Sequence, residues 1–186
     1  MDILRLFPTA IGKVSDFITE EERLKLIKSI KNTIHDTHGS ITGDGFSTFG
    51  MESDLLDNNI RDRLEFQANN YAKTYGITSI ELGKVWSNIQ NKGSVLEKHS
   101  HANCSISGAL YINVDDSCSL TFHNPNPYIY FTDISESLIN INNCQTTAIS
   151  VYNRDLIFFP SWLMHGTHKV VNQYDNRMVI SFNIRS

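Results

Sequence analysis

The sequence has few cysteines, and none of them forms a CxxC pair. Cys104, Cys118 and Cys144 are the three cysteines of the chain, odd in number and widely spaced. A zinc site built on a pair of thiolates is therefore excluded. Such a pattern is typical of free thiols in a reducing compartment, so we expect no disulfide framework.

Long apolar runs and an excess of positive charge are also missing. No apolar stretch approaches the roughly 20 residues that span a bilayer, and the first residues lack the features of a signal peptide. The formal net charge is -4, so the chain lacks the basic field that a nucleic-acid backbone requires. We expect a soluble cytoplasmic protein that does not enter a membrane or bind duplex nucleic acid.

The remaining composition is that of an ordinary globular protein. Hydrophobic residues make up 40% and charged residues 19% of the 186 residues. A chain of this size buries a core without disulfides or a structural metal. We predict one domain over residues 1–186, with helical support over about 18–76 and a β core over about 80–184.

Two amphipathic helices are predicted in the first half of the chain. Thr19 and Glu22 have the spacing of a capping box, and the helix that they open should run to about residue 35. Ser53 should cap the second helix, which should end near Gly76. The polar, glycine-rich residues 37–50 between the two helices indicate a connecting segment.

Short strands separated by turn residues follow the helices. They are predicted at residues 81–89, 105–114, 119–123, 147–152, 155–159 and 178–184. Residues 3–14 contain Pro8 and suit a short edge strand. Two helices followed by a run of strands indicate an α+β fold, with a jelly-roll-like β core and the helices on one side.

The last predicted strand has two different faces because strand side chains alternate. One face is apolar and should pack under the helices, whereas the other is partly polar. The strand 105–114 divides in the same way, which predicts a barrel that holds a small polar molecule. In the last strand the apolar face consists of Met178, Ile180, Phe182 and Ile184, and the other face of Arg177, Val179, Ser181 and Asn183.

Three histidines have the spacing of a metal site. His99 and His101 stand two residues apart, so on a strand they would point to the same face. His165 follows a strongly apolar strand and could meet them across the sheet. Three imidazoles suit iron, copper, zinc or nickel rather than magnesium or calcium. Taken alone, an HxH pair is more often a pair of solvated or core histidines than a metal site.

Several segments, in a fixed order, resemble the Fe(II)/2-oxoglutarate-dependent oxygenase superfamily. The similarity is greatest to a bacterial and phage family with an HxH, an SGxxY strand, an FPSWLxH corner and a closing RxxxSFN strand. It covers about residues 80–184. The matching segments are residues 88–93, 99–101, 108–113, 158–165 and 177–183.

This resemblance implies a fold and a site. The superfamily has a double-stranded β-helix, a distorted jelly roll, which binds Fe(II) through HxD or HxE and a distal histidine. Carried over, His99 and His165 are metal ligands, and Arg177 binds the distal carboxylate of 2-oxoglutarate, for which a guanidinium fork is suited. Tyr111 and Asn88 occupy positions at which relatives contact this small-molecule cosubstrate.

The sequence departs from the superfamily where a carboxylate ligand is expected, because His101 stands there. Glu97 is a poor substitute, since a regular strand places it about 13 Å from His101. We therefore predict the ligand set His99, His101 and His165. A less favoured set replaces His101 by another residue such as His123. Gln90 stands where relatives often have a tyrosine, so the resemblance implies no clear role for it.

The sequence thus predicts an Fe(II)- and 2-oxoglutarate-dependent dioxygenase that hydroxylates a substrate it does not identify. The alternatives are a three-histidine, cupin-like dioxygenase without 2-oxoglutarate and a non-catalytic metal-binding β-barrel. The phage members of the family add, by analogy, a role in modifying a host or virion component. Residues 37–53 and 124–145 are the expected substrate lids.

Three further residues carry local expectations. His38 should be solvated, and Trp162 should be a core anchor that also walls the site near His165. Gly108 should either let the backbone approach a ligand or relieve a strand crossing.

Overall fold

The computed structural model describes residues 1–2, 7–51, 55–116, 118–127, 129, 133–167 and 171–186. A large antiparallel sheet runs through its centre, in the strand order β1-β10-β7-β12-β5-β4-β2. Of the edge strand predicted over residues 3–14, only β1 is present, and it pairs with β10 at the end of the sheet, whereas residues 3–6 lie outside the described residues. The strands are β1 (Gly12–Val14), β2 (Asp36–Thr37), β4 (Gly45–Ser47), β5 (Glu81–Gln90), β7 (Ile106–Asn113), β10 (Leu156–Pro160) and β12 (Arg177–Arg185).

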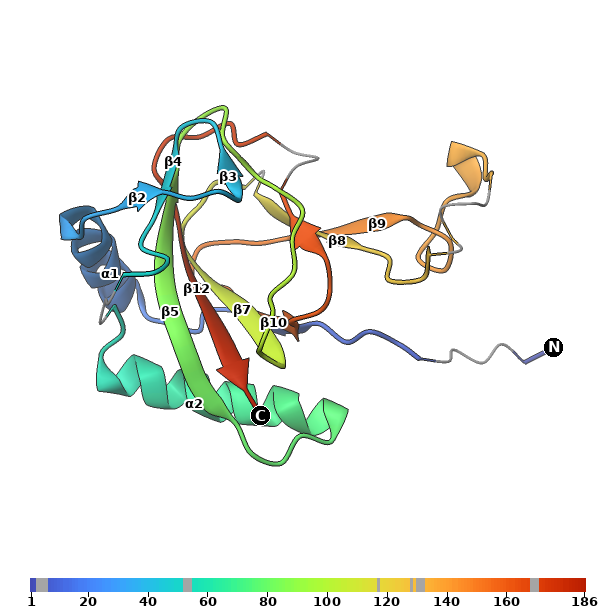
Figure 1. Cartoon of the computed structure of the whole chain (residues 1–186), viewed down its shortest axis with the longest axis horizontal. Helices are drawn as coiled ribbons and strands as arrows, with labels where there is room; N and C mark the ends of the chain where they lie inside the picture. The colour runs from blue at the N-terminus through green and yellow to red at the C-terminus, as the bar shows by residue number, and fades with distance from the viewer. Residues whose placement is uncertain (3–6, 52–54, 117, 128, 130–132, 168–170) are drawn as a thin grey trace.

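A smaller sheet lies against the inner face of this major sheet. Its order is β11-β8-β9, and the three strands are β8 (Ser119–His123), β9 (Thr146–Ser150) and β11 (His165–Gly166). A buried apolar cluster joins inner residues of β7, β10 and β12 to Leu120 and Phe122 of β8. Figure 1 shows the β8–β9 hairpin extending away from the major sheet. Two antiparallel sheets around one core confirm the predicted jelly roll.

The two helices cover the other face of the major sheet (Figure 1). α1 spans Glu20–Asn32, and its capping box is present, because Thr19 and Glu22 exchange hydrogen bonds between side chains and backbone. α2 spans Asn58–Ala72 and continues into a short 3-10 helix, η1 (Lys73–Tyr75), which Gly76 ends with a positive φ of 69°. Gly76 thus closes the second helix as predicted.

The helix boundaries differ from the predicted ones at two places. α1 ends at Asn32 rather than near residue 35. The expected cap Ser53 lies outside the described residues, and α2 begins at Asn58 because the side chain of Asp57 accepts a hydrogen bond from Ile60 N at 2.8 Å. Any oxygen-bearing side chain in this stretch offers a cap, so sequence alone does not choose between the two positions.

The connecting segment 37–50 contains strands that were not predicted. Two of them, β3 (Ile41–Thr42) and β4, lie within the region assigned to helical support. β4 pairs with β5 and so extends the major sheet, whereas β3 pairs with β6 (Val95–Leu96) in a separate ribbon. Strands of two or three residues are too short for a periodic pattern to reveal them.

The predicted division of the last strand is confirmed. Met178, Ile180, Phe182 and Ile184 of β12 are all fully buried in the cluster that contains the helices. The alternate residues Arg177, Val179, Ser181 and Asn183 line a cavity on the inner face. Because each face of this strand is covered, its register places the polar residues inside the barrel.

Gly108 is required by packing on the helix side of β7. A Cβ atom built there would overlap Phe182 Cζ and the carbonyl oxygen of Ile157, and would lie 2.7 Å from Phe182 Cε2. Such a contact forces the ring or the strand to move. Close packing against Phe182 and Ile157 thus accounts for this glycine, and its backbone also lines the cavity on the inner face.

We expect Gly108→Ala to lower the free energy of unfolding by about 3 kcal/mol, because the extra methyl overpacks the core. Urea denaturation followed by far-UV circular dichroism measures this change. Gly39→Ala is the matched control, since a Cβ there meets nothing within 4 Å. Equal stability of the two variants would contradict the packing account.

Candidate metal centre

The three predicted histidines come together in space. Their candidate ligand nitrogens all lie within 4.8 Å of one another. The ring centroids of His99 and His165 are 4.4 Å apart, and the ring of His101 lies 5.1 Å from each of them. Among the described residues this is the one group of histidine, cysteine or acidic side chains with such spacing.

Backbone hydrogen bonds, rather than a regular strand, hold the HxH segment. His99 and His165 form an isolated β-bridge, with N–O distances of 3.0 and 2.9 Å. His101 N donates to the carbonyl of Ser161 at 2.9 Å. The expectation of a strand at residues 99–101 is therefore wrong in extent. The two side chains nevertheless point to the same side, as predicted, because the rings of His99 and His101 stack on each other.

Each ring is oriented through its Nδ1 atom. The oxygen partner is the carbonyl of Glu97 for His99 (2.7 Å), the carbonyl of Leu163 for His165 (2.8 Å) and Oδ1 of Asn183 for His101 (2.6 Å). An oxygen acceptor fixes the proton on Nδ1, so Nε2 keeps a free lone pair. This is the arrangement that orients histidine ligands around a metal ion.

Burial keeps these rings neutral. It lowers the pKa of His99 and of His101 below the usual histidine value. The pKa of His165 falls to about 3, chiefly through burial and further through the nearby His99. A metal binds the neutral imidazole, so the ligand form is present well below neutral pH.

The metal-free protein should lose stability on acidification. The imidazole of His165 takes up a proton near pH 6.5 in the unfolded chain but only near pH 3 in the folded one. The unfolded state therefore binds more protons between these values, and the free energy of unfolding falls as the pH falls. From pH 7 to pH 5 we expect His165 to contribute a loss of about 2 kcal/mol.

Urea unfolding of chelator-treated protein at pH 7 and pH 5 measures this loss. His165→Gln removes the titrating group, so the variant should lose about 2 kcal/mol less than the wild type over the same interval. Identical pH dependence of the two proteins would contradict a buried neutral His165.

Neither of the other ligand candidates joins the cluster. The carboxylate of Glu97 accepts a hydrogen bond from Thr42 Oγ1 at 3.0 Å, and only its backbone carbonyl reaches His99. His123 is buried on β8, outside the group of close ligand nitrogens. The structure thus brings together the favoured set of three histidines.

Asn183 connects His101 to the barrel interior, a contact that the sequence did not indicate. Its Oδ1 accepts hydrogen bonds from His101 Nδ1 and, at 2.8 Å, from Ser107 Oγ. Because that hydroxyl proton is used, Ser161 Oγ donates in turn to Ser107 Oγ, also at 2.8 Å. Strands β7 and β12 and the corner after β10 therefore fix one histidine together.

We expect Asn183→Ala to weaken Fe(II) binding about tenfold, since partners of metal ligands contribute about tenfold to a hundredfold in affinity. Competition with a chromophoric chelator under anaerobic conditions measures the affinity. Asn183→Asp keeps an acceptor for His101 Nδ1 and should bind Fe(II) at least as tightly as the wild type. The prediction fails if the alanine variant binds like the wild type.

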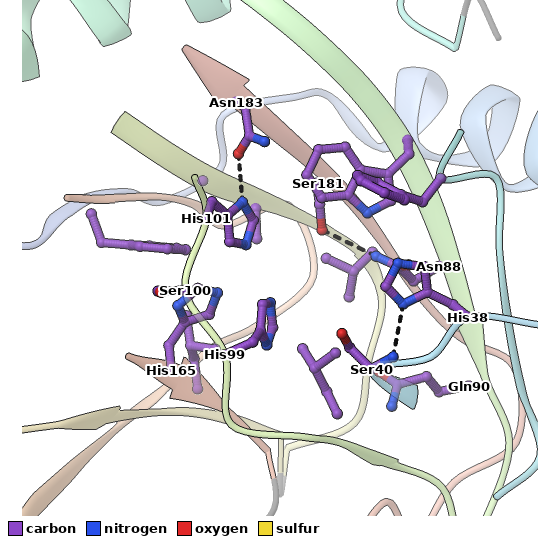
Figure 2. A pocket seen from close by; sticks show the side chains of 18 of the residues that line it. His38, Ser40, Asn88, Gln90, His99, Ser100, His101, His165, Ser181 and Asn183 are labelled. Carbon is purple, nitrogen blue, oxygen red and sulfur yellow. Dashed lines mark hydrogen bonds between the residues drawn. The ribbon is translucent and has the colours of Figure 1, made fainter. Parts of the chain in front are cut away.

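The histidines line a cavity of about 390 Å³ together with Arg177, Tyr111 and Asn88. In the view of Figure 2 the three histidines lie on one side of it, and Asn88 and Gln90 on the other. Asn88 Nδ2 donates to Ser181 Oγ at 3.1 Å. All six predicted site residues thus face one space.

Arg177 is a buried cation with neutral neighbours. Its Nε donates to Cys118 Sγ at 3.2 Å, and its Nη1 donates to Gln90 Oε1. The guanidinium carbon lies 5.9 Å from the ring centroid of Tyr111. Burial raises the pKa of Tyr111 above its usual range, so the phenol stays protonated. A buried cation with no acidic partner among the described residues favours an anionic ligand.

Aromatic side chains form a wall of the cavity that leads to the three histidines. His38 and Trp86 each contact Phe49 edge to face, at 5.0 and 5.1 Å, and Trp86 lies 5.8 Å from His101. All four rings line the cavity. His38 was expected to be solvated, but it is half-buried here, and burial lowers its pKa.

The expectation that Trp162 is a core anchor beside the site is wrong. Trp162 is 54% exposed and does not line the cavity. Described residues of the loop 124–145 do not line it either, whereas residues 37–53 contribute His38, Ser40 and Phe49. Of the two expected lids, only the first thus contributes described residues to the cavity lining.

Comparison of the sequence with known families identifies the class of protein. Residues 84–183 match the family described as "Putative 2OG-Fe(II) oxygenase". The match covers more than half of the chain, which therefore belongs to the family of 2-oxoglutarate- and Fe(II)-dependent oxygenases. The predicted enzyme class and the cofactors Fe(II) and 2-oxoglutarate are confirmed. No curated protein sequence matches the chain.

Solved structures of low sequence identity share the fold. HygX from Streptomyces hygroscopicus, crystallised with nickel, 2-oxoglutarate and hygromycin B, is 11% identical with a TM-score of 0.65, over 95% of this chain and 83% of HygX. A Pseudomonas putida prolyl-4-hydroxylase is 12% identical with a TM-score of 0.62, over 96% and 94% of the two chains. The viral collagen prolyl hydroxylase from Paramecium Bursaria Chlorella virus-1, solved with 2-oxoglutarate, is 12% identical with a TM-score of 0.57, over 95% and 96%.

The helices carry no sign of a membrane span. Within the described ranges, none of them has both the length and the apolar content needed to cross a bilayer.

Proposed function

We propose that His99, His101 and His165 hold Fe(II) and that Arg177, with Tyr111 and Asn88, binds 2-oxoglutarate for the hydroxylation of a further substrate. The convergence of three neutral imidazoles in the cavity that also contains the buried Arg177 carries this proposal. A cation-binding and an anion-binding group then face the same space, as a metal-chelating keto acid requires.

The residues present fit Fe(II). Imidazole nitrogen is a ligand for Fe(II), and each Nδ1 already has an oxygen partner, so the three Nε2 atoms are the donors left for the ion. Three neutral ligands leave the full charge of the cation in place, because His101 replaces a carboxylate. This charge should strengthen the binding of an anionic cosubstrate at the same centre.

The residues present also fit a dicarboxylate. Arg177 offers a fixed charge with planar N–H groups, which suits the far carboxylate of 2-oxoglutarate. Tyr111 is protonated and adds a hydroxyl donor on β7, whereas Asn88 faces the same space from β5. Together these residues fix the keto acid in one orientation toward the histidines.

Bound Fe(II) and 2-oxoglutarate supply oxygen activation, coupled to decarboxylation of the keto acid to succinate. The contribution of the chain is to orient the cosubstrate and to exclude water from a cavity lined largely by buried side chains. The substrate would approach along the aromatic wall of His38, Phe49 and Trp86, which ends beside His101.

Fe(II)-dependent conversion of 2-oxoglutarate to succinate tests this function without knowledge of the substrate. We expect slow succinate formation that needs both Fe(II) and oxygen and that stops when a chelator is added. Oxygen consumption without succinate would instead indicate the three-histidine dioxygenase alternative. Tight zinc binding with neither reaction would indicate a non-catalytic metal-binding barrel.

A further inference from the structure

Gln90 lies directly beside the proposed carboxylate-binding arginine. It is the last residue of β5, and its Cα is paired with that of Arg177 across the β5–β12 ladder. The side chain is 1% exposed and lines the cavity with Trp86 and Asn88, which precede it at alternate positions on the strand. Gln90 is therefore part of the inner wall, on the side away from the three histidines (Figure 2).

The orientation of the Gln90 amide follows from its neighbour. A guanidinium group has only donors, so the oxygen of the amide must face it. The structure has this arrangement, since Arg177 Nη1 donates to Gln90 Oε1. The amide nitrogen is consequently the atom that makes no hydrogen bond to Arg177, and within the described residues this buried Nε2 has no hydrogen-bond partner.

A buried amide nitrogen is rarely left without an acceptor. Gln90 Nε2 sits next to a cation, where an anionic acceptor is favoured over a neutral one. Of the five N–H groups of Arg177, one donates to Cys118 and one to Gln90. The remaining N–H groups of Arg177 and Nε2 of Gln90 are neighbouring donors that one carboxylate group would satisfy.

We propose that Gln90 determines the specificity for the cosubstrate: its Oε1 positions Arg177, and its Nε2 donates a hydrogen bond to the carboxylate of 2-oxoglutarate that Arg177 binds. This inference rests on the proposed function. It assigns a neutral hydrogen-bond donor, Nε2 of Gln90, to the carboxylate site in addition to the cation Arg177. A keto acid without a distal carboxylate leaves both Arg177 and Nε2 unsatisfied, so the pair selects a dicarboxylate.

Gln90→Leu tests the proposal with two keto acids. The variant has nearly the same volume but no donor or acceptor. 2-Oxoglutarate and 2-oxovalerate share the metal-chelating end and differ at the distal carboxylate. The dissociation constant of each is measured from the visible absorption band of the Fe(II) chelate, titrated without oxygen.

We expect Gln90→Leu to lower the affinity for 2-oxoglutarate about tenfold to a hundredfold, because the variant loses a hydrogen bond to a charged group. The affinity for 2-oxovalerate should stay within about threefold, since this ligand makes no such bond. Gln90→Glu keeps an oxygen toward Arg177 but replaces the amide donor by an anion. It should weaken the binding of 2-oxoglutarate at least as much. Gln67→Leu, on α2 behind the sheet, is the matched control and should bind both ligands as the wild type does.

Each other outcome overturns the inference in a distinct way. Equal weakening of both keto acids in Gln90→Leu would reduce Gln90 to a structural role. Unchanged binding of 2-oxoglutarate would show that Nε2 does not donate to its carboxylate. If the wild type forms a chelate with neither keto acid, the proposed function fails, and this inference fails with it.

Discussion

Replacing His165 with alanine is expected to weaken Fe(II) binding more than about a hundredfold, because even indirect partners of a metal ligand contribute about tenfold to a hundredfold. The ring is 3% exposed, and its Nδ1 is bound to the carbonyl of Leu163, so Nε2 has the metal as its proposed partner. Anaerobic titration with Fe(II) against a competing chelator measures the loss. Succinate formation should disappear with it.

His123→Gln is the matched control for this variant. His123 is also buried, lies on the strand that pairs with His165, and was the alternative third ligand. Its replacement should leave the Fe(II) affinity unchanged. A loss of affinity in His123→Gln, with little effect of His165→Ala, would contradict the ligand set.

Replacing Arg177 with alanine is expected to weaken the binding of 2-oxoglutarate roughly a hundredfold, or about 3 kcal/mol, while Fe(II) binding persists. The reason is that the guanidinium is buried and lines the cavity in which the keto acid is proposed to bind. The chelate band should then appear only at high concentrations of the keto acid, and succinate formation should show a raised KM.

Arg177→Lys separates charge from geometry. Lysine keeps the positive charge but lacks the planar fork that bonds to Gln90 and Cys118. We expect an affinity between those of the wild type and Arg177→Ala. Wild-type affinity in Arg177→Ala would exclude this arginine from the cosubstrate site.

Alternation along single strands made the barrel interior predictable. β12 places Met178 and Phe182 under the helices and Arg177 and Asn183 in the cavity, because both faces of the strand are covered and differ in polarity. The same period on β5 places Trp86, Asn88 and Gln90 on the inner face. That pattern was present in the sequence and would have identified Gln90 as a cavity residue.

Contacts between distant segments were not predictable in this way. The sequence does not show that Asn183 accepts from His101, that Arg177 donates to Gln90, or that His38 packs on Phe49. These pairs depend on strand register and on short ribbons such as β3 and β6, which are fixed by the folded chain as a whole. The start of α2 was missed for a local reason, since the buried Leu55 and Leu56 before Asn58 resemble a helical face.

A crystal structure grown without oxygen, with Mn(II) in place of Fe(II) and with 2-oxoglutarate, tests the central claim most directly. We predict one metal ion bound by Nε2 of His99, His101 and His165, with the far carboxylate of the keto acid at Arg177. A metal held by His123 or Glu97, or a keto acid that does not reach Arg177, would contradict the account.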